Sequence, residues 1–443
     1  MKHTNICIVG AGPGGICAAL SLAKRNIPCT LIDKATFPRD KVDGDILPTI
    51  VMRSLFRIIP ELVDKLEQAE FSKPVWGNHI FAPNGKKITI HYPSVSLGEY
   101  KDYPSCYATR REDFDNMLLE EIRNEPLIEF IEGQGISDFE RIGNEVILKD
   151  KKGKFQIQTP LVFIANGANS ALARKLANIK VEDEHCAVAV RGYFEGVENL
   201  LDEDYPELYF IEGLLPGILY LARLPNGQVN LNMGLRSDIV KDKKMQLRNL
   251  MFDFIKNDPI LKKRFANAKL VGRVKGYTLP FGTKKRKLCG DNYMLIGDAA
   301  GMIDVASGNG IGNAMISGIM AAEKAESCIA EKNYSASFLQ NYHDDVHRKL
   351  ENYLKMGNVL APFAGYTRLY GFYKHLLNFI IGRSSNSAVI TRLLYESDLD
   401  KKLKQPSFYY DLLFKTKSAN TPINQDRVNY EAKKKEVLES VLV

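Results

Sequence analysis

Glycines and a carboxylate near the N-terminus have the types and spacing of a dinucleotide-binding site. Gly10, Gly12 and Gly15 follow a short apolar segment, and Asp33 closes the next apolar segment. Glycines in this pattern permit a tight turn, let the backbone approach a pyrophosphate, and allow a helix to pack closely on a strand. Asp33 stands about 20 residues further on, where a carboxylate meets a ribose hydroxyl. We therefore predict a dinucleotide whose phosphates face a helix N-terminus.

The residues around these glycines predict the elements that such a site requires. Ile16, Ala19, Leu20 and Ala23 recur at helical spacing, between two apolar runs that read as strands. Many helices begin with glycines, so the alternative is a purely structural turn. The order of strand, glycine turn, helix, strand and carboxylate favours the cofactor site.

A second strand, turn and helix is predicted near residue 300. Asp298 follows an apolar strand, and Gly308 and Gly310 precede a helix of small and apolar residues that ends near Ala330. A carboxylate at a strand end can hold a polyol, and amides at a helix N-terminus can face an anion. The alternative is an ordinary strand, turn and helix.

Composition narrows the classes of protein. A chain of 443 residues exceeds one ordinary core, so we expect two interlocked domains. The net charge of +7 is scattered along the chain, which argues against nucleic acid as a partner. Seven cysteines without a CxxC pair favour reduced thiols in a cytoplasmic protein over disulfides or a metal site. No apolar stretch reaches the ~18 residues that a membrane span needs.

Between the glycine-rich segment at 10–15 and the Asp298 segment, the pattern of apolar residues changes. Residues 71–107 and 183–276 contain short alternating apolar runs broken by turn residues, which predicts antiparallel strands. Residues 128–136, 145–149 and 155–158 are predicted to form a small meander. Residues 46–66 show a helical pattern.

The segment after Asp33 carries a family resemblance. Its sequence FPRDKVDGD resembles the FPRxKxCGD signature of the geranylgeranyl reductase-like and flavin-dependent halogenase-like branches of the FAD oxidoreductases. Asp43 stands where those reductases usually carry cysteine. Lys34 and Arg39 are cations beside the predicted phosphate site, although a solvated loop would also contain them.

Three later segments extend the resemblance. The RxxFD pattern at Arg111 is similar to the family segment whose arginine contacts FAD, and the stretch from Gly297 resembles the family's GDAAG signature. In that family the aspartate corresponding to Asp298 binds the ribityl chain. The stretch from Tyr220 resembles a YxWxFP motif of prenyl reductases, with Ala222 in place of the tryptophan. This exchange reshapes whatever pocket the strand lines.

The resemblance implies an α/β fold with FAD as cofactor and no metal. The FAD-binding domain is Rossmann-type and discontinuous, at 1–70, 108–182 and 277–340. A mostly antiparallel β-sheet substrate domain is interleaved at 71–107 and 183–276. The residues assigned to FAD are Gly10, Gly12, Pro13, Gly14, Gly15, Asp33, Lys34, Arg39, Gly44, Asp45, Arg111, Ile136, Gly297, Asp298, Gly308, Gly310 and Ile311.

The activity that the resemblance implies first is reduction of a double bond in an isoprenoid or other lipid-like substrate. Hydride would come from reduced flavin, and Asp43 is the candidate acid. The alternatives are a monooxygenase or halogenase acting on a lipophilic or aromatic substrate, and a flavin-binding protein without turnover. The electron donor is expected to be NAD(P)H or a reductase.

The C-terminal part of the chain is predicted to be a helical region at 341–415 and a polar tail at 416–443. Residues 359–383 are rich in aromatic and aliphatic side chains with interspersed cations. They predict a helical cap on the core; the alternatives are a substrate mouth or a peripheral membrane contact, which would make the cytoplasmic protein membrane-associated.

Overall fold

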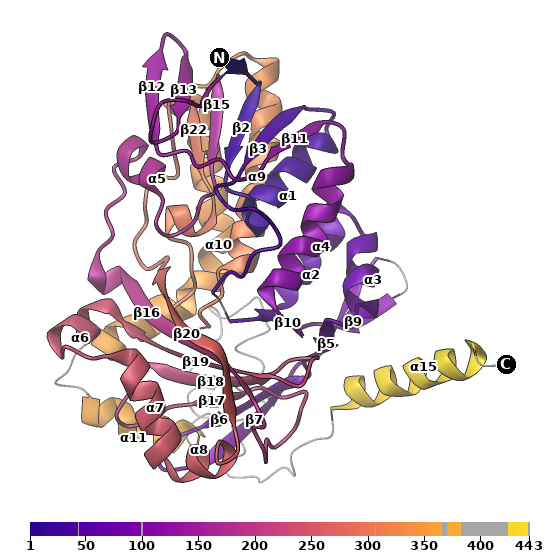
Figure 1. Ribbon diagram of the computed structural model, residues 1–443, viewed down its shortest axis with the longest axis vertical. Helices are drawn as coiled ribbons and strands as arrows, with labels where there is room; N and C mark the ends of the chain where they lie inside the picture. Colours follow the sequence, from indigo (N-terminus) through magenta and orange to yellow (C-terminus); the bar gives the residue numbers. More distant parts are fainter. Residues whose placement is uncertain (43, 99–100, 306, 366–369, 382–423, 442–443) are drawn as a thin grey trace, which may run out of the picture.

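The computed structural model describes residues 1–42, 44–98, 101–305, 307–365, 370–381 and 424–441. The predicted acid Asp43 therefore lies outside the described residues, as do parts of the predicted C-terminal helical region and tail. Figure 1 shows two main bodies, an upper one around a parallel sheet and a lower one around an antiparallel sheet.

The upper body is built on a six-stranded sheet in the order β11-β3-β2-β15-β22-β21. Its strands are parallel except for the last pair. The central strands are buried along their whole length, as expected for parallel strands covered on both faces. Their bounds are β2 (Ile6–Val9), β3 (Cys29–Ile32), β11 (Ile128–Ile131), β15 (Leu161–Ile164), β21 (Cys289–Gly290) and β22 (Tyr293–Leu295).

Three helices pack together beside this sheet: α1 (Pro13–Ala23), α4 (Arg111–Asn124) and α9 (Ile311–Ala330). The contact between α1 and α9 depends on glycine. A Cβ on Gly318 would lie 2.1 Å from the carbonyl oxygen of Gly14, so the two backbones approach more closely than any side chain allows. This packing holds the predicted glycine turn beside the segment from Asp298 to Gly310.

A four-stranded sheet in the order β1-β14-β13-β12 adjoins the parallel sheet. It comprises β1 (Lys2–His3), β12 (Asp138–Ile142), β13 (Glu145–Lys149) and β14 (Gln156–Thr159). The predicted meander was wrong in its first member, because residues 128–131 form β11 and pair in parallel with β3. An edge strand with one covered face has the same alternating pattern as a strand of a meander.

The lower body is a seven-stranded sheet in the order β20-β16-β19-β18-β17-β6-β7, antiparallel except between β17 and β6. One face is apolar and includes Leu221 and Leu231, and the helices α7 and α8 cover it. The element bounds are β6 (Gly77–Phe81), β7 (Lys87–His91), β16 (Cys186–Glu195), β17 (Glu207–Tyr209), β18 (Ile218–Arg223), β19 (Val229–Arg236), β20 (Lys269–Pro280), α7 (Leu247–Asn257) and α8 (Pro259–Arg264).

Short elements connect the two bodies. They are β4 (Ile46–Leu47), β5 (Ser72–Pro74) and β10 (Tyr107–Thr109), which form one small sheet, and β8 (Ser94–Leu97) and β9 (Lys101–Pro104), which form another. The helical pattern at 46–66 becomes two helices, α2 (Thr49–Ile58) and α3 (Glu61–Gln68), because Pro60 cannot donate a helical hydrogen bond. The remaining short helices are α5 (Ala171–Leu176) and α6 (Ser237–Asp242).

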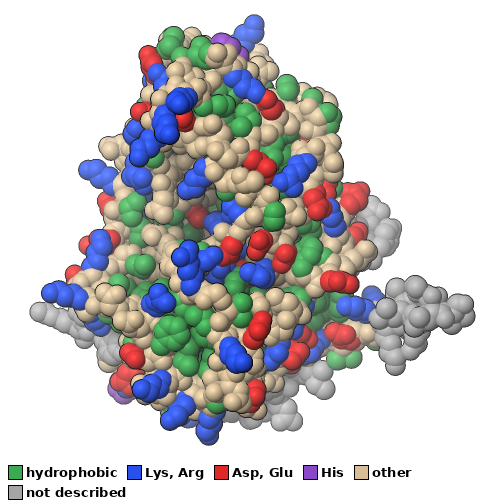
Figure 2. Space-filling view, viewed as in Figure 1, with side chains coloured by type: hydrophobic (Ala, Val, Ile, Leu, Met, Phe, Trp, Pro, Cys, Tyr) green, Lys and Arg blue, Asp and Glu red, His purple; other side chains and the backbone are tan. Residues whose placement is uncertain are grey.

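The C-terminal region contains α10 (Ala336–Gly365), α11 (Tyr370–Ile381) and α15 (Gln425–Val441). Figure 1 shows α15 projecting from the body, with its first turn nearest the rest of the chain. The Asn424 amide anchors that end by donating to the carbonyl oxygens of Trp76 and Tyr92, each at 3.1 Å. Within the described residues, none of the helices has the length and apolar character required to cross a bilayer. Figure 2 shows lysines and arginines interspersed with acidic side chains on this face.

Candidate active site

The glycine turn between β2 and α1 leaves a cradle at the end of the parallel sheet. Gly10 has a φ of +112°, and a Cβ there would lie 2.5 Å from the carbonyl oxygen of Ala165. Gly12 caps α1 in an extended conformation without a side-chain hydrogen bond, and Pro13 occupies the first helical position. A Cβ on Gly12 would meet only the Arg39 guanidinium, at 4.0 Å. The space above Gly12 therefore fits a pyrophosphate, with a helix N-terminus on one side and a cation on the other.

Asp33 lies beside this turn because β3 is the neighbour of β2. Its carboxylate accepts hydrogen bonds from the backbone N–H groups of Ala11, at 2.7 Å, and Ala35, at 2.8 Å. The loop after β11 reaches the same place, since the Gly133 N–H donates to the Ala35 carbonyl oxygen. Ile136 in that loop is buried. The fold thus brings Asp33 and Ile136, which were both predicted to bind FAD, to the same end of the parallel sheet.

Arg39 belongs to a charge cluster with Arg111 and Asp115. Arg111 is fully buried, and its Nη2 lies 2.9 Å from Asp115 Oδ1 in the same helix. Arg39 Nη1 lies 3.5 Å from the other carboxylate oxygen of Asp115. Two guanidinium groups therefore approach one carboxylate next to Gly12, and guanidinium groups are suited to bind phosphates there.

The turn at Asp298 lies beside the FPRDK loop. Lys41 Nζ lies 3.9 Å from Asp298 Oδ2, and a Cβ on Gly310 would lie 3.0 Å from Asp298 Oδ1. Helix α9 begins at Ile311 after Gly310, which has no side chain to cap it. The Asn309 side chain accepts from the Gly312 N–H at 3.4 Å, and the positive end of the helix dipole still favours an anion here. Gly297 and Gly308 hold the turns on either side with φ values of +61° and +69°. This arrangement can hold the ribityl chain at Asp298 and place the flavin ring near the α9 N-terminus.

Asp45 lies at the centre of a buried network between the two bodies. Its carboxylate accepts from the Tyr193 hydroxyl and the Asn230 amide, each at 2.7 Å, and from the Arg111 N–H at 3.1 Å. Asp45 is fully buried. Burial and the adjacent Asp45 carboxylate raise the pKa of Tyr193, so its hydroxyl stays protonated and donates. The carboxylate of Asp45 thus joins the motif loop, the start of α4 and the seven-stranded sheet.

Asp40 makes a second link from the motif loop to this sheet. Both oxygens of its carboxylate accept from Arg191 Nη2, at 3.0 and 2.9 Å, and the carboxylate also accepts from Lys275. Partial burial raises the pKa of Asp40, but the Lys275 and Arg191 contacts outweigh it and lower the pKa overall. Arg191 also donates to the Tyr193 hydroxyl, so the two links form one network.

Apart from Asp45 and Arg111, the residues of these two networks were not predicted as site residues from the sequence. Asp40 and Lys41 lie inside the FPRDK segment and Asp115 inside RxxFD, so the motifs contained a signal for them. Tyr193 carried none, and Asn230 lies in the stretch after Tyr220 that resembles the prenyl reductases, but only the pairing of distant strands brings the two residues to Asp45. The described part of the chain holds no group of three His, Cys, Asp or Glu side chains suited to a metal ion.

The polar face of the seven-stranded sheet looks toward this network. Ala222 pairs with Asn230 and therefore shares its face, and Tyr220 is on the same side of β18. The Asn230 amide reaches Asp45, so this face opposes the FPRDK loop across the interface. Ala222, the position of the family's tryptophan, therefore lies on the face of the seven-stranded sheet that meets the FPRDK loop.

Comparisons with known proteins agree with this geometry. Residues 3–192 match the FAD binding domain family. The digeranylgeranylglycerophospholipid reductase of Methanococcus vannielii is 30% identical over 80% of this chain and 86% of its own. The chain belongs to the geranylgeranyl reductase-like FAD-dependent oxidoreductases. This flavoprotein is also similar to the menaquinone reductase of Mycobacterium tuberculosis, 26% identical over 73% of this chain and 76% of the relative.

Solved structures share the fold of this FAD-dependent enzyme. A geranylgeranyl bacteriochlorophyll reductase-like protein from Thermoplasma acidophilum superposes with a TM-score of 0.74 at 20% identity, over 91% of this chain and 99% of that one. A myxobacterial chondrochloren halogenase superposes with a TM-score of 0.68 at 18% identity, over 94% of each chain. The predicted Rossmann-type fold, the FAD cofactor and the oxidoreductase class are confirmed.

Proposed function

We propose that this flavoprotein reduces a carbon–carbon double bond of an isoprenoid or other lipid-like substrate. The observation that carries the proposal is the relation to the digeranylgeranylglycerophospholipid reductase, which extends over both bodies of the fold. The FPRDK loop, the Asp298 turn and the strand with Ala222 all meet at the interface between those bodies. A substrate bound there would lie between the flavin and the polar face of the sheet.

The residues at this interface have distinct roles in the proposal. When bound and reduced by the electron donor, FAD would supply a hydride to one alkene carbon. The α9 N-terminus at Ile311 favours the negative charge that reduction brings to this region. Asp298 would bind the ribityl chain, with the Lys41 ammonium 3.9 Å from its carboxylate. The network around Asp45 fixes the motif loop against the sheet and so sets the width of the interface.

The other alkene carbon needs a proton, and we assign its delivery to Asp43. In the sequence, Asp43 is two residues from the anchored Asp45 and two from Lys41. A carboxylic acid can give a proton to the carbon that becomes electron-rich as hydride adds to its neighbour. The electron donor in this proposal is NAD(P)H or a reductase. The substrate's lipophilic chain would be taken from a membrane surface that the protein contacts peripherally.

Anaerobic turnover tests the reaction. The FAD-loaded protein is reduced chemically, mixed with a geranylgeranyl lipid without oxygen, and the lipid is analysed by mass spectrometry. The proposal predicts that the lipid gains hydrogen and no oxygen. A lipid that changes only in the presence of oxygen, and then gains oxygen or halogen, would instead support a monooxygenase or halogenase.

Asp43→Asn tests the acid in the same assay. We expect the rate of hydrogen addition to fall by about 10²-fold or more, with the FAD content unchanged. Asp138→Asn is the matched control, because the Asp138 carboxylate is exposed on β12 and pairs with Lys175. Equal rates for both variants would remove Asp43 from the mechanism without affecting the proposed reaction.

A further inference from the structure

The net positive charge of the chain comes from one segment of the lower body. Residues 241–273 hold ten lysines and arginines against three aspartates, so their net charge of +7 equals that of the whole chain. The segment contains α7 and α8, which cover the apolar face of the seven-stranded sheet. Asn230, which reaches Asp45, is on the other face. The excess charge therefore lies on the side of the sheet away from the FAD domain.

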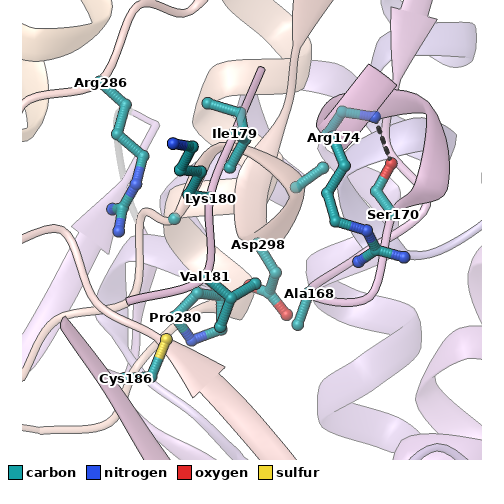
Figure 3. A pocket seen from close by; sticks show the side chains of 13 residues that line it. Ala168, Ser170, Arg174, Ile179, Lys180, Val181, Cys186, Pro280, Arg286 and Asp298 are labelled. Carbon is teal, nitrogen blue, oxygen red and sulfur yellow. Dashed lines mark hydrogen bonds between the residues drawn. The ribbon is translucent and has the colours of Figure 1, made fainter. Parts of the chain in front are cut away.

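Cations also line the small pocket beside the Asp298 turn (Figure 3). They include Lys180 and Arg286, and the pocket shares Asp298 with the FAD site. Those cations therefore adjoin the cofactor site. The cations of residues 241–273 have no such neighbour and need a different explanation.

Helix α7 turns cations and an aromatic ring to the surface. Leu247 and Met251 pack into the apolar core, so the positions that follow them at 248, 252 and 256 face outward. These positions hold Arg248, Phe252 and Lys256, and all three are exposed. Phe252 is 37% exposed. An aromatic side chain therefore lies between two cations along the outer side of the helix.

Helix α8 adds two neighbouring cations, Lys262 and Lys263, which are both exposed. Among the residues that the structure describes, the exposed cations of α7 and α8 form no ion pair. Asp253 is the acidic residue that these two helices expose. Figure 2 shows lysines and arginines at the lower end of the molecule, where Figure 1 places α8. The basic surface is defined as Arg248, Phe252, Lys256, Lys262 and Lys263.

We propose that the basic surface docks the protein on an anionic lipid membrane. This deepens the proposed function, because the choice of a membrane as partner rests on the lipid-like substrate proposed there. Lysine and arginine are attracted to anionic head groups, and their alkyl chains can lie along the apolar boundary of the membrane. An exposed aromatic ring between them can enter that boundary. A site for nucleic acid phosphates would need the cations but not the ring.

The basic surface lies at the end of the sheet where β18 begins. The loop after β17 contacts both α7 and α11. Lys374 Nζ in α11 lies 2.5 Å from Glu212 Oε1, and a Cβ on Gly213 would lie 3.4 Å from the ring of Phe254 in α7. The same loop leads into β18 at Ile218. A membrane against α7 would therefore lie close to the start of the strand that carries Ala222.

Vesicle flotation of the oxidised, FAD-loaded protein tests the proposal without turnover. Vesicles of phosphatidylglycerol and phosphatidylcholine in equal parts, without isoprenoid lipid, should bind the protein at low salt. Vesicles of phosphatidylcholine alone should bind at least about tenfold more weakly. The double variant Lys262→Gln, Lys263→Gln should weaken binding to the anionic vesicles by about tenfold or more. Phe252→Ser should weaken it by about threefold.

Lys151→Gln, Lys152→Gln is the matched control. These adjacent lysines are exposed in the turn between β13 and β14 of the upper body, outside the basic surface. The control removes the same charge and should leave vesicle binding unchanged. Equal weakening by the two double variants would overturn the proposal, as would equal binding to anionic and neutral vesicles. Absence of vesicle binding would also overturn it, and binding of duplex RNA in its place would assign the surface to nucleic acid.

Turnover of a detergent-solubilised geranylgeranyl lipid separates this proposal from the proposed reaction. The Lys262→Gln, Lys263→Gln variant should reduce that lipid at the wild-type rate, because no membrane is needed. Turnover by a protein that binds no vesicles would overturn the docking surface alone. Vesicle binding by a protein that reduces no lipid would support the docking surface and count against the reaction.

Discussion

Two glycines, Gly12 and Gly318, lack side chains for different physical reasons. The space above Gly12 is open and bounded by Arg39, whereas a Cβ on Gly318 would strike the backbone of Gly14 at 2.1 Å. The first position accommodates the cofactor, and the second brings α1 and α9 together. Substitution at the two positions should therefore affect different properties.

Gly12→Val should abolish FAD binding and leave the FAD-free protein intact. Its φ of −83° and ψ of 176° are accessible to valine, but the side chain fills the phosphate space. We expect FAD affinity to fall by at least about 10²-fold, because clash and loss of phosphate contacts add. Flavin absorbance of the purified protein and fluorescence titration measure it.

Gly318→Ala is the control for this prediction. It should lower the free energy of unfolding of the FAD-free protein by about 2 kcal/mol, as overpacking does. Tight FAD binding by Gly12→Val would contradict the assignment of the cradle, whatever its stability.

Asp40→Asn should destabilise the fold near neutral pH and matter less in acid. The folded-state pKa of Asp40 is lowered, so its ionised form stabilises the fold above the unfolded pKa of about 3.9. This contribution is lost as the pH falls through the lower folded pKa. Because Arg191 is buried and Asp40 is part-exposed, we expect a loss of about 2 kcal/mol at pH 7.

Urea unfolding of wild type and Asp40→Asn at pH 7 and near pH 3 measures this difference. Asp138→Asn again serves as the exposed control, with an expected change below about 0.5 kcal/mol. A difference between wild type and Asp40→Asn that grows as the pH falls would contradict the ion-pair explanation.

At the scale of elements, β18 and β19 present one face of the seven-stranded sheet to the FPRDK loop. Their shared face carries Tyr220, Ala222 and Asn230, while the opposite face packs Leu221 and Leu231 into the apolar core. The alternation of the strand therefore places the small Ala222 at the interface and not in the core. A larger side chain at this position would reduce the room for substrate.

Ala222→Trp should lower kcat/KM for a geranylgeranyl lipid by about tenfold or more, because the indole fills the interface. FAD content should be unchanged, since the cradle at Gly12 is formed by the glycine turn and Arg39 and not by β18. Ala222→Ser adds a single oxygen atom at the same position. It is the control for a small substitution and should retain most activity. Steady-state kinetics with lipids of different length measure the effect. Unchanged kinetics for the tryptophan variant would show that the substrate does not bind next to Ala222.

At the scale of the whole molecule, residues whose neighbours in the site are close in sequence were easier to predict than residues whose partners are distant in sequence. The glycine turn, Asp33 and Asp298 were predictable because each belongs to one strand, turn and helix in sequence. The role of Asp45 was not, because its partners come from α4, β16 and β19. The motif assigned Asp45 to FAD; its carboxylate here accepts from protein donors between the bodies, and a direct contact with FAD stays a prediction.

Arg111 illustrates the same limit. Resemblance predicted a contact with FAD, and the fold pairs its guanidinium with Asp115 in the next turn of α4. The i, i+4 spacing of these two residues was visible in the sequence. That Arg39 would reach the same carboxylate was not, because it depends on how the FPRDK loop folds over α4.

The central claim is that this flavoprotein transfers hydride to an alkene of a lipophilic substrate. Single-turnover spectroscopy of the reduced, FAD-loaded protein in the strict absence of oxygen tests it most directly. The account predicts that a geranylgeranyl lipid accelerates reoxidation of the flavin at least about tenfold over a fully saturated lipid of equal length. Reoxidation at the same rate with both lipids, or only after oxygen is admitted, would contradict it.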